Sequence, residues 1–281
     1  MGRSNYQFFT ESLNIDAQER LSLENDLRDA IDKGDFELYY QPQMGSLSHE
    51  VCGAEVLLRW NHPTRGMVPP DIFIRIAEES NLILPLGEWV LEEACRQQQQ
   101  WRTTFKKQIK VAVNISPQQL ASGDIASLVK MLMKKYDMGI GDLSLEVTET
   151  AAMENPDQAI ARLKEIRELG VELAIDDFGT GYSSLAYLKL LPIQTLKLAR
   201  AFVSDIEDNI HVATICSASI GLSHNLGFNV VAEGVETKEQ EDFLIDLGCE
   251  VIQGYYFCRP ISSHDVELFM FKPKLDPILN T

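Results

Sequence analysis

The sequence contains no apolar segment of the roughly 20 residues that a helix needs to cross a bilayer. Residues 1–5 lead into no signal-peptide core. Cysteine is scarce, and the five cysteines are odd in number with no CxxC pair, which argues against a disulfide framework and a zinc site. We therefore expect this part of the chain to be soluble, without membrane contact, and to lie in the reducing cytoplasm.

Positive charge is also in short supply. Lysine and arginine number 25 against 42 acidic residues, which gives a net charge of -17. A surface of this sign disfavours duplex nucleic acid as a partner, because such binding relies on neutralising many phosphates. A small phosphate ester remains open as a ligand if metal ions and one or two arginines reverse the local field.

What the sequence does contain is a regular alternation of strand-like and helix-like segments, which is typical of βα units and a parallel sheet. The 281 residues, 45% of them hydrophobic, are enough for one large α/β domain. The segments predicted as strands are 36–43, 53–60, 110–116, 143–149, 172–178, 195–199, 229–234 and 251–257. Eight such strands favour a closed barrel.

The first connection departs from this pattern. Residues 43–53 are too few for a helical crossover between parallel strands, so we predict a hairpin and a first strand that is antiparallel to its neighbour. Residues 1–35 have a different character, with a charged helical stretch, and are predicted to be a leader and linker helix. The expected organisation is therefore this leader followed by one barrel domain over residues 36–275.

Polar side chains recur near the carboxyl ends of the predicted strands, where a buried parallel strand should be apolar. From Asn114 to Gln253 the first such residue of each strand follows the one before it by 20 to 36 residues, about one βα unit, so these residues should meet at the catalytic end of a barrel. Any one of them could instead be a satisfied ion pair or a helix cap. These residues are Glu55, Asn114, Glu146, Glu149, Asp176, Asp177, Lys197, Glu233 and Gln253.

The composition of this set indicates the chemistry. Carboxylates dominate and histidine and cysteine are missing, which suits Mg²⁺ or Mn²⁺ rather than zinc or copper. The adjacent Asp176 and Asp177 can reach two ions about 3.5 to 4 Å apart, the separation used in two-metal phosphodiester cleavage. Lys197 could then orient or deprotonate the water between them. Arg59 is the best candidate for a phosphate contact, and a structural ion pair is its alternative.

The motifs in order resemble the EAL-domain cyclic di-GMP phosphodiesterases. The resemblance runs from about residue 36 to 271. Its motifs are YYQP at 39–42, EVLLRW at 55–60, VNIS at 113–116, EVTET at 146–150, DDFGTGYSSL at 176–185, the lysine of LKLAR, AEGVET at 232–237 and QGYYF at 253–257.

This resemblance implies a modified TIM (βα)8-type barrel with an antiparallel first strand, two Mg²⁺ or Mn²⁺ ions, and cyclic di-GMP as substrate. It also implies a homodimer through the region after Asp177. The roles it implies are metal binding by Glu55, Asn114, Glu146, Asp176 and Asp177, completion of the shell by Glu233 and Gln253, contact with the catalytic water by Lys197, positioning of the 178–184 loop by Glu149, and substrate contact by Arg59, Gln41 and Gln253.

The sequence departs from the family pattern at three places. The signature triplet reads Glu55-Val56-Leu57, and Arg75 stands where the family usually has proline; neither change should affect catalysis. In the family's Lys-x-Asp motif, however, the aspartate is replaced, because the chain reads Lys197-Leu198-Ala199. Loss of a carboxylate two residues from the lysine should lower turnover through the pKa or position of that lysine.

Three functions are therefore weighed. The first is a metal-dependent phosphodiesterase that converts cyclic di-GMP to linear pGpG. The second is a catalytically impaired EAL domain that acts as a cyclic di-GMP receptor, and the third is an unrelated metal-dependent barrel enzyme. The leader GRSNYQFFTES resembles the end of a GGDEF domain, so we expect a larger signalling protein whose parent chain could carry a membrane anchor.

Overall fold

The computed structural model describes residues 11–122, 124–179 and 185–271. The chain folds into two compact units, one formed by residues 1–37 and 59–86 and the other by residues 38–58 and 87–281. The predicted domain boundary near residue 35 is not tested by this division and stays a prediction. Residues 1–10 and 272–281, which include part of the predicted leader and the end of the predicted domain, lie outside the described residues.

The first unit consists of helices and a short antiparallel ribbon around an aromatic cluster. The ribbon pairs Trp60 with Val68. Phe36 and Phe73 both contact Trp60, with ring centroids 5.7 Å away in each case, and burial of such rings stabilises the unit. Its elements are α1 (Glu11–Lys33), the start of β1 (Phe36–Gly45), the end of β2 (Val51–His62), β3 (Gly66–Val68), α2 (Pro70–Glu79) and the start of α3 (Ile83–Phe105).

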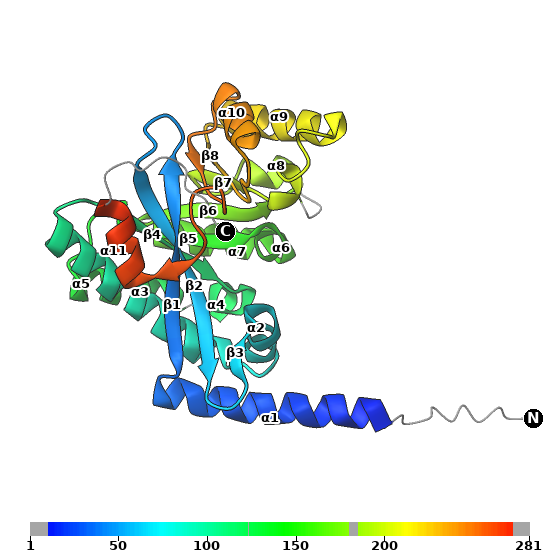
Figure 1. Ribbon diagram of the computed structural model, residues 1–281. Helices are drawn as coiled ribbons and strands as arrows, with labels where there is room; N and C mark the ends of the chain where they lie inside the picture. Colours follow the sequence, from blue (N-terminus) through cyan, green and yellow to red (C-terminus); the bar gives the residue numbers. More distant parts are fainter. Residues whose placement is uncertain (1–10, 123, 180–184, 272–281) are drawn as a thin grey trace, which may run out of the picture. The chain divides into compact units, whose positions relative to one another are not determined.

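The second unit contains most of the chain and carries the barrel (Figure 1). The strands close in the order β1-β9-β8-β7-β6-β5-β4-β2, with β2 pairing back to β1 and β10 lying against the outer edge of β1. Besides most of β1 and β2, these strands are β4 (Lys110–Ile115), β5 (Leu143–Thr148), β6 (Glu172–Phe178), β7 (Thr195–Leu198), β8 (Asn229–Ala232), β9 (Val251–Ile252) and β10 (Ile261–Ser262).

Helices connect these strands and cover the barrel. In Figure 1 they lie around β4 to β8, and apolar side chains such as Leu132, Leu163 and Ile166 are buried against the strands. The helices are the rest of α3, α4 (Pro117–Ser122), α5 (Ile125–Lys135), α6 (Glu149–Glu154), α7 (Pro156–Arg167), α8 (Leu185–Leu188), η1 (Arg200–Phe202), α9 (Ile210–Asn225), α10 (Lys238–Asp246) and α11 (Ser263–Phe271).

The direction of the first strand is the departure from a regular barrel that the short connection predicts. β1 runs antiparallel to β9, whereas every pair from β2 through β4 to β9 is parallel. The modified TIM barrel with an antiparallel first strand is therefore confirmed. The predicted boundaries of the other strands differ from the structure by at most two residues, but that of the last strand is wrong. β9 ends at Ile252 rather than continuing to residue 257, because the chain turns back at Gly254, where Phe257 and Cys258 donate to its carbonyl.

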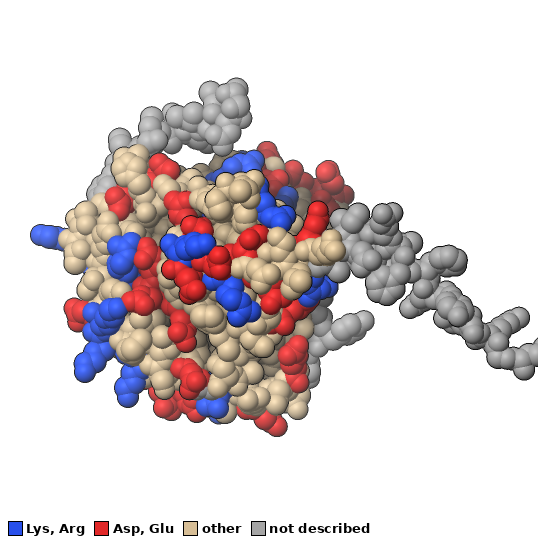
Figure 2. Space-filling model, turned by 90° about the horizontal axis from the view of Figure 1, so that it is seen from below, with Lys and Arg blue, Asp and Glu red and all other residues tan. Residues whose placement is uncertain are grey.

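Acidic and basic side chains are interspersed over the face shown in Figure 2. The acidic side chains on that face do not form a block of one sign. Among the residues that the structure describes, no helix is both long enough and apolar enough to cross a bilayer.

Candidate active site

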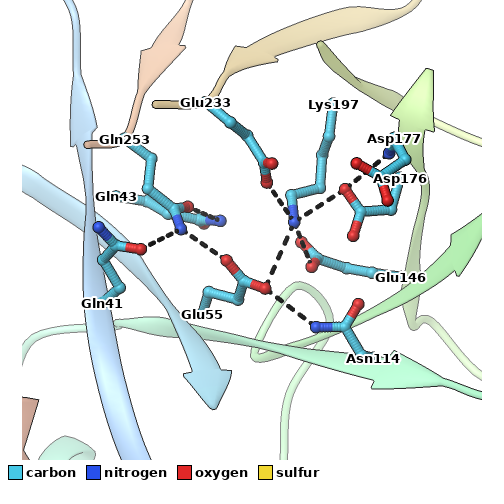
Figure 3. A network of polar contacts seen from close by, with 10 residues as sticks. All are labelled: Gln41, Gln43, Glu55, Asn114, Glu146, Asp176, Asp177, Lys197, Glu233 and Gln253. Atoms are coloured by element: carbon cyan, nitrogen blue, oxygen red, sulfur yellow. Dashed lines mark hydrogen bonds and ion pairs between the residues drawn. The ribbon is translucent and has the colours of Figure 1, made fainter. Parts of the chain in front are cut away.

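Strand register brings the predicted polar residues to one end of the barrel. Asn114 on β4 lies opposite Glu146 on β5, and Thr148 on β5 lies opposite Asp176 on β6. Neighbouring parallel strands therefore deliver their polar groups at the same level, as expected for the carboxyl ends of barrel strands. Figure 3 shows the side chains of this cluster pointing toward one another.

Lys197 occupies the centre of the cluster. Its side chain is fully buried, and its Nζ lies 2.6 Å from both Glu146 and Glu233, 3.2 Å from Asp176 and 3.6 Å from Glu55. A buried ammonium is costly unless it is paired. Four carboxylates thus surround one cation, and the lysine holds their oxygens close together.

A β-bulge explains why two adjacent aspartates can serve one site. Ile175 pairs with Leu196 and Phe178 with Leu198, so β6 carries one more residue than β7 over this stretch. Asp177 has a φ of 53°, a left-handed conformation that aspartate tolerates better than most residues. Successive side chains of a regular strand face opposite sides, whereas here Asp176 and Asp177 lie together near Glu233.

Five carboxylates form two overlapping groups that could each hold a cation. Oxygens of Glu55, Glu146 and Asp176 lie within 4.8 Å of one another, and so do oxygens of Asp176, Asp177 and Glu233. Asp176 belongs to both groups, as a residue shared by two ions must. The donor set is entirely oxygen, which fits hard divalent cations such as Mg²⁺ and Mn²⁺.

The charge of the cluster favours cation binding as well. Five carboxylates against one lysine leave four negative charges when all are ionised. Burial raises the pKa of Glu233 to about 7 and the pKa of Glu146 well above its usual range, although Lys197 lowers both. Burial lowers the pKa of Lys197, but the carboxylates, Glu146 foremost, raise it well above the usual value. In this cluster Lys197 is therefore an ammonium that donates to the carboxylates around it, Glu146 among them.

A series of carboxamide side chains, linked by hydrogen bonds, holds Glu55 in place. Gln253 donates to Glu55 over 2.5 Å and to Gln41 over 3.0 Å, and Gln43 donates to Gln253 over 3.1 Å. Asn114 donates to the other oxygen of Glu55 over 2.9 Å. Both oxygens of Glu55 thus have donors, which hold its orientation.

Two predicted residues lie outside this network. Glu149 begins α6, is buried, and accepts the backbone N–H of Gly179 over 2.7 Å. Gly179 has a φ of 95°, and a Cβ there would lie 2.3 Å from Phe202, so glycine is required where this contact forms. Residues 180–184, the rest of the loop that Glu149 was predicted to position, are outside the described residues. Arg59 belongs to the first unit, and its predicted phosphate contact stays a prediction.

Sequence reasoning missed three residues of this region. Gln43 could have been found, because it lies two residues after Gln41 on one strand and so faces the same side. Arg200 and Glu236 line a pocket with Glu55 and Glu233. Arg200 lies three residues after Lys197 and Glu236 three residues after Glu233. Both follow the end of a strand, β7 and β8 respectively, where the sequence has no periodic pattern that would indicate them.

A family model described as the EAL domain matches residues 24–260. The chain belongs to the EAL domain family. The match includes every residue of the cluster around Lys197 and confirms the resemblance read from the motifs.

Named relatives agree with this assignment. The EAL domain is 41% identical to the bifunctional diguanylate cyclase/cyclic di-GMP phosphodiesterase MucR of Pseudomonas aeruginosa over 94% of this chain and 39% of that protein. It is 42% identical to the cyclic di-GMP phosphodiesterase NbdA of the same organism over 98% of this chain and 35% of that protein. This chain thus spans well under half the length of these relatives.

A solved structure gives the same result for the fold. The structure described as the PaMucR phosphodiesterase in complex with c-di-GMP superposes with a TM-score of 0.84 at 40% identity, covering 87% of this chain and 99% of that one. The likeness therefore extends over almost the whole of a phosphodiesterase domain that binds the cyclic dinucleotide.

Proposed function

We propose that this EAL domain hydrolyses one phosphodiester bond of cyclic di-GMP and releases linear pGpG, with two divalent metal ions in its site. The observation that carries the proposal is the pair of carboxylate groups that share Asp176 around the buried Lys197. The likeness to MucR and NbdA supports the choice of substrate, and the MucR complex with c-di-GMP supports its binding at this fold.

In this reaction the oxygen of a water molecule bonds to phosphorus, the bond from phosphorus to the 3′ oxygen breaks, and that oxygen takes up a proton. Two bound divalent cations would lower the pKa of water and stabilise charge on the leaving oxygen. Glu55, Asn114, Glu146 and Asp176 would hold one of them, and Asp176, Asp177 and Glu233 the other. Mg²⁺ and Mn²⁺ both suit this oxygen set.

The other residues position these groups. Lys197, as an ammonium, keeps the carboxylate oxygens together and can orient the attacking water by donating to it. Gln253 donates to Glu55 and also to Gln41, which helps to hold it in place, and Glu149 holds the backbone that follows Asp177. We also propose that Arg59 contacts a substrate phosphate, that the region after Asp177 forms a homodimer contact, and that the protein acts in the cytoplasm, where its five free thiols remain reduced.

The test is incubation of the purified chain with cyclic di-GMP and Mn²⁺ or Mg²⁺, with and without EDTA, followed by chromatography of the nucleotides. We expect pGpG to form only when Mn²⁺ or Mg²⁺ is present and is not chelated by EDTA. Binding of cyclic di-GMP without any product would replace the phosphodiesterase by the receptor function. Absence of both binding and product would refute the substrate itself.

We expect the residue at position 199 to affect the rate of this reaction. Ala199 is buried, precedes η1, and has no side chain that can cap it. We expect Ala199→Asp to raise kcat by about tenfold with little change in the affinity for cyclic di-GMP, because a carboxylate returns two residues from Lys197 and can cap the first turn of η1. Steady-state kinetics with Mn²⁺ measure the effect.

The matched control is Ala199→Asn, which restores a cap of the same size without the charge. A gain with aspartate alone assigns the effect to charge near Lys197, and an equal gain with both assigns it to the cap. A fall in kcat for Ala199→Asp would show that alanine is the better residue in this barrel.

A further inference from the structure

A buried glutamine, Gln43, lies behind the residues that the proposed reaction uses. It belongs to β1, and its side chain is 3% exposed. Its amide nitrogen donates to the amide oxygen of Gln253 over 3.1 Å, and Gln253 in turn donates to Glu55. Gln43 is therefore linked to a carboxylate of the proposed metal site through a single intervening side chain.

The order of the hydrogen bonds fixes the direction of each carboxamide. Gln41 donates to the backbone carbonyl of Cys258 over 3.1 Å, and because a carbonyl only accepts, the amide oxygen of Gln41 faces Gln253. The amide nitrogen of Gln253 donates to this oxygen over 3.0 Å and to Glu55 over 2.5 Å. An amide nitrogen carries two hydrogens, so both are used. The amide oxygen of Gln253 needs a donor from elsewhere.

Gln43 supplies this donor. Among the hydrogen bonds of the described residues, its amide nitrogen is the one group that donates to the amide oxygen of Gln253. Gln253 is itself 3% exposed, so bulk water has little access to that oxygen. A buried acceptor without a partner is costly, which makes the bond from Gln43 important for the direction of its neighbour.

Without a donor at position 43, the carboxamide of Gln253 has two unfavourable orientations. If it keeps its direction, its oxygen is buried without a hydrogen bond. If it turns over, this oxygen faces the carboxylate of Glu55 and the amide oxygen of Gln41, and both of these groups accept. Gln43 thus selects the orientation in which Gln253 can donate to Glu55.

The strand that carries Glu55 leaves space for Gln43. A Cβ on Gly53 of β2 would lie 2.8 Å from the amide oxygen of Gln43, which is closer than these atoms can approach. Gly53 is two residues before Glu55, and alternate residues of a strand face the same side. The carboxamide of Gln43 therefore fills a place that β2 leaves open on the side of the strand that bears Glu55.

We propose that Gln43 is a positioning residue of the metal site: its amide N–H sets the direction of the Gln253 carboxamide and, through it, the direction of Glu55. Glu55 is one of the carboxylates that could hold a divalent cation. Replacing a residue that orients a metal ligand typically lowers metal affinity about 10- to 100-fold. The assignment rests on the proposed function for the presence of the ions and adds a residue that controls their affinity.

The experiment is a calorimetric titration of Mn²⁺ into the metal-free chain, comparing Gln43→Met with Gln43→Lys. Methionine has a similar length and no donor, whereas lysine has a donor and a positive charge. We expect Gln43→Met to raise the Kd of Mn²⁺ about 10-fold and Gln43→Lys to stay within about threefold of wild type. Charge alone predicts the opposite order, because a lysine near the carboxylates would repel the cation.

Gln97→Met is the matched control. Gln97 lies on α3 and is also 3% exposed, but its amide nitrogen has no hydrogen-bond partner among the described residues. This variant should keep the wild-type Kd. A second comparison uses Gln253→Met: in that background Gln43→Met should cause no further loss of Mn²⁺ affinity, because Gln43 acts through Gln253.

Kinetics with cyclic di-GMP separate positioning from a general loss of structure. Gln43→Met should need about 10-fold more Mn²⁺ for its half-maximal rate. Its kcat at saturating Mn²⁺ and its KM for cyclic di-GMP should stay within about threefold of wild type, because the ligands themselves are retained. A folding defect would lower kcat at every concentration of Mn²⁺.

An unchanged Kd in Gln43→Met would overturn the proposal. Weaker binding in Gln43→Lys than in Gln43→Met, or an equal loss in Gln97→Met, would do the same. If the wild-type chain binds Mn²⁺ but forms no pGpG, the proposed reaction fails by itself and the titrations still decide the role of Gln43.

If the wild-type chain binds no Mn²⁺, the proposed function fails, and urea unfolding of the metal-free chain decides whether Gln43 acts on Gln253. Gln43→Met should then lower the urea midpoint of the wild-type chain and leave that of Gln253→Met unchanged. An equal fall in both backgrounds would refute the link between the two glutamines.

Discussion

Replacing Asp176 by alanine is expected to lower the rate of pGpG formation at least about 1000-fold, equivalent to about 4 kcal/mol of transition-state stabilisation. Asp176 is the residue that both carboxylate groups share, and it also pairs with Lys197 over 3.2 Å. Its loss removes a ligand from both proposed ions at once. Steady-state kinetics at saturating Mn²⁺ and calorimetric titration of Mn²⁺ into the apo chain measure the two consequences.

Two further substitutions test whether the loss of turnover comes from the carboxylate of Asp176. Asp176→Asn keeps an oxygen that can accept the backbone N–H of Asp177, a bond of 2.9 Å, but removes the charge, so it should lose turnover nearly as completely. Glu172 lies at the other end of the same strand, where it pairs with Lys110. The variant Glu172→Gln should therefore keep wild-type kinetics. Turnover within tenfold of wild type in Asp176→Ala would remove the two-metal site.

Replacing Lys197 by methionine is expected to destabilise the metal-free domain by about 3 kcal/mol or more and to reduce turnover at least about 100-fold. The stability loss follows because removal of one partner leaves buried carboxylates without their cation. Added Mn²⁺ should restore much of the stability, since a ligand that binds only the folded state stabilises it by mass action. Urea unfolding with and without Mn²⁺ measures this recovery.

The control for Lys197→Met is Lys110→Met. Lys110 also pairs with a carboxylate, 2.7 Å from Glu172, but both side chains are partly exposed, so we expect a loss of at most about 1 kcal/mol. Similar losses for the two lysines, or no recovery of Lys197→Met with Mn²⁺, would contradict the view that Lys197 holds the charge of an ion-binding cluster.

The sequence was most informative where backbone geometry repeats. Polar residues spaced by one βα unit, such as Asn114, Glu146 and Asp176, were predicted to meet, and strand register places them at one end of the barrel. The short segment after Gln43 was enough to predict an antiparallel first strand. Both inferences rest on backbone geometry that holds for any α/β sequence: the repeat of strands and the minimum length of a connection between parallel strands.

Contacts between particular side chains that are distant in the sequence had no such signal. The position of Arg200 over Gly234 depends on two segments that meet only after the barrel closes. The chain of carboxamides from Gln43 to Glu55 likewise joins residues separated by about 200 positions in the sequence. Composition and spacing do not predict which of these side chains contact one another, because such contacts depend on how the ends of different strands are packed.

The sequence by itself determined the family, the barrel, the direction of its first strand and the set of polar residues that gather at one end of the barrel, since these follow from motifs and from the periods of strands and helices. The tertiary structure decided that Lys197 is enclosed by four carboxylates and therefore remains an ammonium. It also decided that a bulge with Asp177 at a φ of 53° turns two adjacent aspartates into one site. Burial, charge pairing and local backbone strain are properties of the closed barrel, and they arise only when distant strands come together.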